Sequence, residues 1–62
     1  MLFEVKSSEH GISANITESS NPKYKYRLLR VDDDSGKTVA VTFGDNFERF
    51  VILANEFVKG EL

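Results

Sequence analysis

The sequence predicts an α+β fold: a four-stranded antiparallel meander sheet with one C-terminal amphipathic helix packed across one face. Apolar and polar residues alternate in four segments, near residues 2–6, 11–18, 23–31 and 37–43, which is typical of half-buried strands. Polar turns that contain Gly or Pro separate these segments. Residues near 46–59 follow a helical period instead. Four strands followed by one helix therefore predict a single layered domain spanning residues 1–62.

The helix is predicted from the spacing of its apolar residues and from signals at both ends. The apolar residues recur at i, i+3, i+4, i+7, i+10 and i+11, and they are Phe47, Phe50, Val51, Ala54, Phe57 and Val58. Asp45 is the expected N-cap, with Glu48 three residues later as in a capping box. Gly60 fits the C′ position, and Lys59 suits the negative end of the helix dipole.

Each predicted strand places one apolar face toward this helix. The segments read LFEVK, ISANITE, KYKYRLLRV and KTVAVTF. Turn residues lie between them, and Gly36 is expected to supply the positive φ of the last hairpin. The predicted core consists of Phe3, Val5, Ile12, Ala14, Ile16, Tyr26, Leu28, Val39, Val41, Phe43, Phe47, Phe50, Val51, Ala54, Phe57 and Val58.

The third segment loses its alternation at Leu28 and Leu29. A β-bulge at this point would restore the pattern, and Tyr24, Tyr26, Leu28 and Val31 would then face the helix. Without a bulge the strand would end near Leu29. The sequence leaves both alternatives open.

The size and composition of the chain limit how it is stabilised. A chain of 62 residues buries only about 60% of its unfolded surface, so it is marginally stable alone. It has no cysteine and one histidine, which excludes disulfides and Cys-based zinc sites. Oligomerisation remains, and we expect a homodimer. No segment is apolar enough for a membrane span or a signal peptide, and we expect a cytoplasmic protein. The start at Met1 and the helix stop favour a whole domain over a fragment.

The cationic residues are unevenly distributed, although the net charge is −2. Five of the eight Lys and Arg residues lie between positions 23 and 37: Lys23, Lys25, Arg27, Arg30 and Lys37. The first four are expected to line the sheet face opposite the helix. Such a stripe can bind phosphates, and it can equally be a solvated face whose lysines protect the sheet from aggregation.

The order of elements resembles the Whirly and PUR-repeat group of single-stranded nucleic-acid-binding proteins. The similar segments are the basic strand Tyr26–Val31, the hairpin at Gly36 and Lys37, the strand Val39–Val41, and the spaced phenylalanines of Phe47–Phe50. The resemblance covers roughly the last forty residues. It implies a homodimer that binds nucleic acid on the sheet, although this chain is more acidic than such binders.

Two functional hypotheses follow. In the first, a single-stranded nucleic acid binds the basic sheet face; Tyr24 and Tyr26 could stack on bases only if they face away from the helix or lie at an edge. In the second, the chain is a protein-interaction module, a regulator or inhibitor that docks its partner through an edge strand or the sheet face. Ile52 lies off the apolar helix face. It is either an ordinary exposed residue or a contact with a partner subunit or with the chain ends.

No motif in the sequence indicates catalysis, and we expect neither an enzyme nor a cofactor. Asp32, Asp33 and Asp34 do not have the spacing of an EF-hand loop, so they are expected to form a solvated hairpin tip. His10 lies in a turn with no nucleophile placed beside it. The sequon at Asn15 lies in a predicted strand and is read as a chance match.

Overall fold

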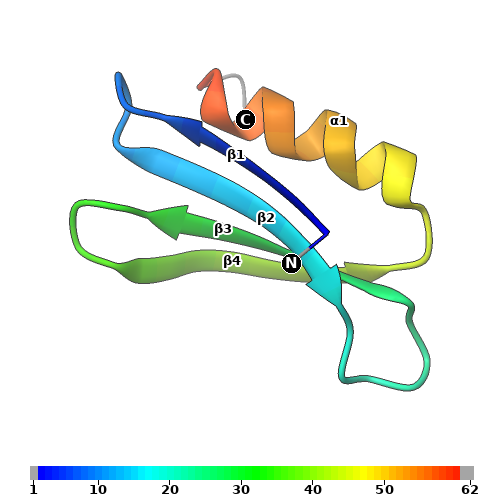
Figure 1. The fold of residues 1–62 in the computed structure, drawn as a ribbon. Helices are drawn as coiled ribbons and strands as arrows, with labels where there is room; N and C mark the ends of the chain where they lie inside the picture. The colour runs from blue at the N-terminus through cyan, green and yellow to red at the C-terminus, as the bar shows by residue number, and fades with distance from the viewer. Residues whose placement is uncertain (1, 61–62) are drawn as a thin grey trace.

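The computed structural model describes residues 2–60 and contains one sheet and one helix (Figure 1). The elements are β1 (Phe3–Ser7), β2 (Ile12–Glu18), β3 (Tyr26–Asp32), β4 (Lys37–Gly44) and α1 (Phe47–Val58). The strands follow one another in the order β1-β2-β3-β4, and every neighbouring pair is antiparallel. The predicted α+β class and the meander order are therefore confirmed.

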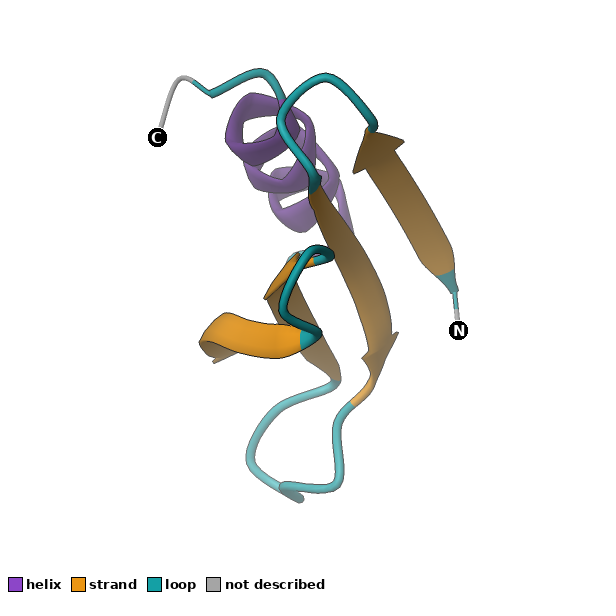
Figure 2. Cartoon of the chain, turned by 90° about the vertical axis from the view of Figure 1, so that its left-hand side faces the viewer, coloured by secondary structure: helices purple, strands orange, loops and turns teal. Residues whose placement is uncertain are grey.

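The helix covers only part of the sheet. It packs mainly on β2 and also on β1 and β3, and it hardly touches β4. Figures 1 and 2 show α1 lying to one side of the sheet, near β1 and β2, while β4 lies at the far side. One face of the sheet is thus open along its whole width, and β4 is uncovered on both faces for most of its length.

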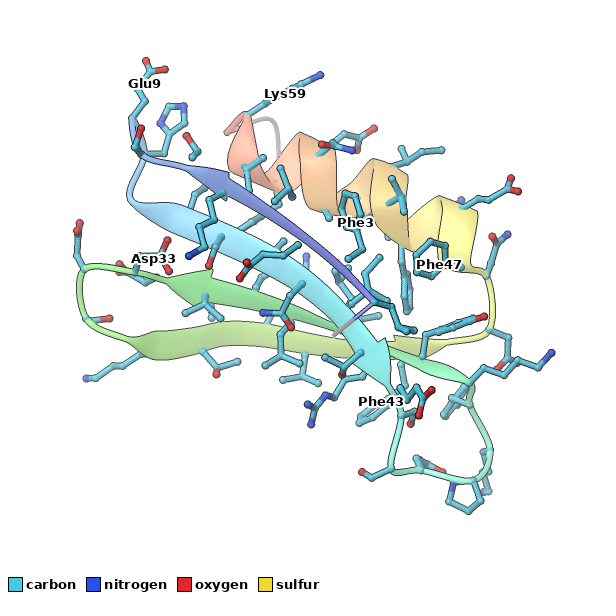
Figure 3. The ribbon with its side chains drawn as sticks, viewed as in Figure 1. Phe3, Glu9, Asp33, Phe43, Phe47 and Lys59 are labelled. Carbon is cyan, nitrogen blue, oxygen red and sulfur yellow. The ribbon has the colours of Figure 1, made fainter. Side chains whose placement is uncertain are left out.

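The core fills the space between α1 and the first three strands. Its fully or nearly fully buried members are Ala14, Ile16, Leu28, Phe50, Ala54 and Val58. Half-buried side chains surround them: Phe3, Val5, Ile12, Tyr26, Phe47, Val51, Leu53 and Phe57. Figure 3 shows Phe3 and Phe47 between the helix and the sheet. The core prediction is confirmed for every member except the three from β4.

Strand β3 alternates without interruption as far as Asp32. Both alternatives that the sequence left open are therefore wrong: there is no bulge at Leu28 and Leu29, and the strand does not end near Leu29. The pairing of β2 with β3 keeps one register from Ile12↔Asp32 to Glu18↔Tyr26. The irregularity lies in β4 instead, where Arg30 pairs with Ala40 and Val31 pairs with Thr38. Val39 is the extra residue of this bulge. Because the alternation of β3 continues, Val31 faces away from the helix, whereas the bulge would have turned it toward the helix.

Val39, Val41 and Phe43 do not belong to the core; they lie on the sheet face opposite α1. The phase of β4 is set at its end, where Gly44 is opposite Tyr26 on the helix side of the sheet. A Cβ atom added to Gly44 would lie 2.8 Å from Cζ of the buried Phe50. This position therefore has room only for glycine, and strict alternation then turns Phe43 and Val41 outward.

The helix begins one residue later than predicted. Asn46 is the N-cap, and its side chain accepts a hydrogen bond from the backbone N–H of Arg49 (3.1 Å). Asp45, the predicted cap, accepts instead from the backbone N–H of Lys25 (2.8 Å) and so ties the β2–β3 loop to the start of the helix. Gly60 has a φ of 79° just past the C-cap Lys59, as the sequence predicts.

Replacing Asn46 by alanine is expected to destabilise the fold by about 1 kcal/mol, because the Arg49 amide then loses its acceptor. Asn46→Asp keeps an acceptor and is the matched control. Urea denaturation followed by circular dichroism measures both variants. Equal stability of Asn46→Ala and Asn46→Asp would contradict the assignment of Asn46 as the cap.

Candidate interaction surface

The open face of the sheet, opposite α1, changes character from one side to the other. Residues opposite one another in an antiparallel pair share a face, so the register assigns every strand residue to a side. On β1 and β2 the open face is polar, with Glu4, Lys6, Ser13, Asn15 and Thr17. On β3 and β4 it is mainly apolar, with Arg27, Leu29, Val31, Thr38, Val39, Val41 and Phe43.

Five of these side chains form a continuous apolar strip, namely Leu29, Val31, Val39, Val41 and Phe43. Leu29 is directly opposite Val41, and Arg27 is directly opposite Phe43 at one end of the strip. The exposed fractions are 59% for Val39, 47% for Val41 and 39% for Phe43. Figure 3 shows Phe43 on the side of the sheet away from Phe3 and Phe47. A cluster of this kind on so small a chain is typical of a binding surface.

An aromatic pair extends the apolar strip at the end nearest the β2–β3 loop. The rings of Tyr24 and Phe43 are stacked, with centroids 6.0 Å apart and planes at 26°. Tyr24 remains 41% exposed. It lies in a loop that is held by hydrogen bonds from the Tyr24 N–H to the Asn21 carbonyl (3.1 Å) and from the Lys23 N–H to the Asn21 side chain (3.0 Å).

The five cations that the sequence groups together do not form one stripe. Lys23 and Lys25 lie in the β2–β3 loop rather than in β3, and both are exposed. Arg27 is on the open face, where its Nε donates to Thr17 Oγ1 (3.3 Å). Arg30 lies on the opposite side, level with Ala14 and Ala40. The predicted alignment of Arg30 with Lys23, Lys25 and Arg27 is therefore wrong.

The side chain of Arg30 is occupied within the fold. Its Nη2 donates to Thr42 Oγ1 (2.8 Å), a diagonal neighbour on the helix side of the sheet. Its Nε is buried and has no hydrogen-bond partner within residues 2–60. Lys37 is on the same side as Arg30, opposite Asp32 at the start of β4. Alternation explains the placement of Arg30, which lies between Leu29 and Val31 on the open face. The bulge explains that of Lys37, because in a strand that alternated without the bulge at Val39 it would share the face of Val41 and Phe43.

Tyr26 and Ile52, the other two candidate residues, lie far from the apolar strip. Tyr26 faces the helix as predicted, and its ring meets that of Phe47 edge-on, with centroids 5.4 Å apart. It is therefore unable to stack on a base at the open face. Ile52 is 57% exposed on the outer side of α1. Its exposure is as expected, and a subunit contact there stays a prediction.

The two edges of the sheet differ in charge. β1 carries Glu4 and Lys6 near its centre, and charged residues of this kind discourage a further strand from pairing. β4 has no charged residue from Thr38 to Phe43, and the sequence TVAVTF is rich in β-branched side chains. Its outer edge has no neighbouring strand within residues 2–60. β4 thus combines an open edge with exposed apolar side chains.

The ends of the two outer hairpins meet at the other end of the sheet. Ser13 Oγ donates to Asp33 Oδ1 (2.9 Å), and the Asp33 N–H donates to the Gly11 carbonyl (2.9 Å).

In the described part of the chain, no group of three or more His, Asp or Glu side chains is placed to hold a metal ion. Residues 2–60 contain no detectable pocket, and no helix among them is long and apolar enough to cross a membrane.

Sequence reasoning missed the apolar strip because it assigned the β4 members to the core and left Leu29 without a face. One signal for it is present in the sequence. An unbroken alternation through YRLLRV places Leu29 and Val31 on one face and Leu28 on the other. Both faces of β3 are then partly apolar, which indicates that both faces are contact surfaces.

Comparison of the chain with protein-family models, with curated proteins and with solved structures found no match.

Proposed function

We propose that this protein is a non-enzymatic protein-interaction module that docks a partner through the apolar strip. The observation that carries the proposal is the exposure of Val39, Val41 and Phe43 on the uncovered face of the sheet. Burying apolar surface contributes about 25 cal/mol per Å², so this strip is where a partner gains most from contact. The polar half of the same face, with Asn15 and Thr17, supplies hydrogen-bonding groups at the rim.

The chemistry of the strip favours a protein over a nucleic acid. Phosphates require several cations along one path, and the open face of the strands offers only Lys6 and Arg27. Three valines and a leucine provide no flat π-surface for bases. They fit apolar side chains from another protein, with Phe43 as an aromatic anchor at one end.

A single-stranded nucleic acid is the second candidate ligand, and one observation favours it. The stacked Tyr24 and Phe43 rings lie at the same end of the sheet as Arg27 and near the loop that carries Lys23 and Lys25. Aromatic rings beside cations form the usual platform for single strands. The resemblance to the Whirly and PUR-repeat group remains an expectation that agrees with this candidate.

Selection from a displayed random-peptide library tests the proposed function, because it samples many partner sequences at once. We expect enriched apolar peptides that shift the NMR amide signals of Leu29, Val31 and Val41. Val41→Lys should weaken their binding about tenfold or more, which corresponds to ~1.4 kcal/mol. Ile52→Lys, at a comparably exposed site on the helix, is the matched control and should leave binding unchanged. Absence of enriched peptides, or equal binding by both variants, would contradict the proposal.

The nucleic-acid candidate is tested separately by fluorescence anisotropy with a labelled single-stranded oligonucleotide. Electrostatic binding is strongest at low salt, so the titration starts there. The proposed function predicts no binding. Micromolar binding that falls with added salt and is lost in the Lys23→Ala/Lys25→Ala/Arg27→Ala variant would replace it with the second candidate.

A further inference from the structure

We propose that β4 pairs in solution with β4 of a second copy of this chain. The two strands run antiparallel about a two-fold axis at Val41, and the two sheets join into one. The sequence predicts a homodimer but locates its contact only at Ile52, on the opposite layer of the molecule. The present inference concerns the outer edge of β4 and does not require the proposed function to hold.

Of the two edges of the sheet, the outer edge of β4 is better suited than that of β1 to pair with another strand. It is eight residues long and lies at the end of the strand order β1-β2-β3-β4. The helix, which packs on β1, β2 and β3, leaves it uncovered. Its central six residues carry no charge, in contrast to β1 with Glu4 and Lys6. A long, uncharged edge with high β-propensity is a template for another strand. The same edge of a second copy can pair with its free backbone N–H and C=O groups.

The side-chain pattern of β4 selects the register. Opposite residues share a face, so an axis at Val41 places Val41 against Val41 and Val39 against Phe43 of the other copy. All three apolar side chains then meet apolar partners. Sliding one copy by a single residue would place Val39 opposite Thr42 and mix the two faces of the sheet. Sliding by two residues, to an axis at Ala40, would pair Val39 with Val41 and leave Phe43 beyond the bulge of the other copy, without an apolar partner.

The charges at the ends of the strand select the direction. With the axis at Val41, the two Lys37 side chains lie at opposite ends of the ladder, on the helix side of the sheet, and so do not meet. A parallel in-register pair would instead place Lys37 beside Lys37 and Asp45 beside Asp45, and like charges repel. Both residues are exposed. The bulge lies at Val39, so the pairs next to the axis come from the regular part of β4.

Pairing at this edge also changes the open face. The apolar strips of the two copies become neighbours and form one surface that crosses the two-fold axis. The contact adds backbone hydrogen bonds and cross-strand apolar pairs to a 62-residue chain with a small core. The dimer accordingly supplies the additional stabilisation that a domain of this size requires.

Cysteine cross-linking tests the register directly, because the chain has no cysteine of its own. Directly opposite residues in an antiparallel pair have Cα atoms about 4.5–5.5 Å apart. This range lies within the roughly 4.4–6.8 Å that a disulfide spans. Mild oxidation of Val41→Cys should therefore give a covalent dimer of twice the 7.0 kDa chain mass.

Two single-cysteine controls make the result specific. Ala40 is opposite Thr42 of the second copy, so the two Ala40 Cα atoms are about 8 Å apart and Ala40→Cys should cross-link at least tenfold more slowly. Ile52→Cys, on the outer side of α1, should behave in the same way. Equal rates at positions 40 and 41, or fastest cross-linking at position 52, would overturn the proposed register.

Analytical ultracentrifugation supplies an independent measurement. The unaltered chain and Ile52→Lys should sediment as dimers, and Val41→Lys should sediment as a folded monomer because its two lysines meet at the axis. Circular dichroism verifies folding, and if Val41→Lys does not fold, the near-isosteric Val41→Cys still decides the question. A monomeric unaltered chain would overturn the dimer. Peptide binding by that monomer would leave the proposed function intact, so the two failures are distinguishable.

Discussion

Leu28→Ala is expected to remove about 2–5 kcal/mol from the free energy of unfolding, the range for emptying a buried leucine site. Leu28 has no exposed surface and lies in the core between Ile16 and the helix side of β4. A domain of 62 residues has a total stability of roughly 3–9 kcal/mol at about 0.05–0.15 kcal/mol per residue. One substitution therefore removes a large part of this stability and should lower the midpoint of urea denaturation markedly.

Leu29→Ala is the matched control for this prediction. It makes the same chemical change one residue further along β3, on the open face, where Leu29 is only half-buried. Urea denaturation of both variants should show a clearly smaller loss for Leu29→Ala. A loss at Leu29 as large as that at Leu28 would mean that the open face is packed as tightly as the core. The assignment of the two faces would then be wrong.

Gly44→Ala is expected to destabilise the fold by about 1–3 kcal/mol, the cost of forcing an extra carbon into a packed core. The added Cβ would lie 2.8 Å from Phe50 Cζ and 3.3 Å from Phe50 Cε1, so the ring has to move. Phe50 is 5% exposed and has little space in which to do so. Thermal or urea unfolding measures the loss.

A double-mutant cycle shows whether Phe50 is the cause. Phe50→Leu removes the far end of the ring, and the combined Gly44→Ala/Phe50→Leu variant should lose less stability than the sum of the two single variants. Gly36→Ala is the comparison. Its φ of 73° makes alanine unfavourable by about 1–2 kcal/mol, but no atom other than those of its chain neighbours lies within 4 Å of the added carbon. Its effect should add to that of Phe50→Leu. Additive behaviour at Gly44 would contradict the steric explanation.

The sequence was sufficient for the element order because each element carries its own local period. The helix face from Phe47 to Val58 and the alternation of β1 and β2 specify secondary structure and buried side together. For β4 the alternation specifies two faces without saying which one the helix covers. That choice depends on a tertiary contact, the approach of Phe50 to Gly44, which no local pattern contains.

The candidate site was predicted less well for a related reason. Lys23, Lys25, Arg27 and Arg30 are close in sequence, and a strand with a bulge would have aligned them. The Asn21–Pro22 turn keeps Lys23 and Lys25 in a loop, and regular alternation sends Arg27 and Arg30 to opposite sides of the sheet. A bulge at Leu28 and Leu29 would also have turned Val31 toward the helix and away from the open face. The position of one extra residue thus decides whether this face is expected to carry a basic stripe or the apolar strip.

The alternation of β3 has a consequence for how this protein can change. Leu28 stabilises the fold from one side of the strand, whereas Leu29 and Val31 lie on the other side, which we propose as the recognition surface. Substitutions on the recognition side meet no helix, so they can alter which partner is bound at little cost to folding. Under the proposed function, folding and specificity would depend on alternate positions of the same seven-residue strand, and selection could act on each almost independently.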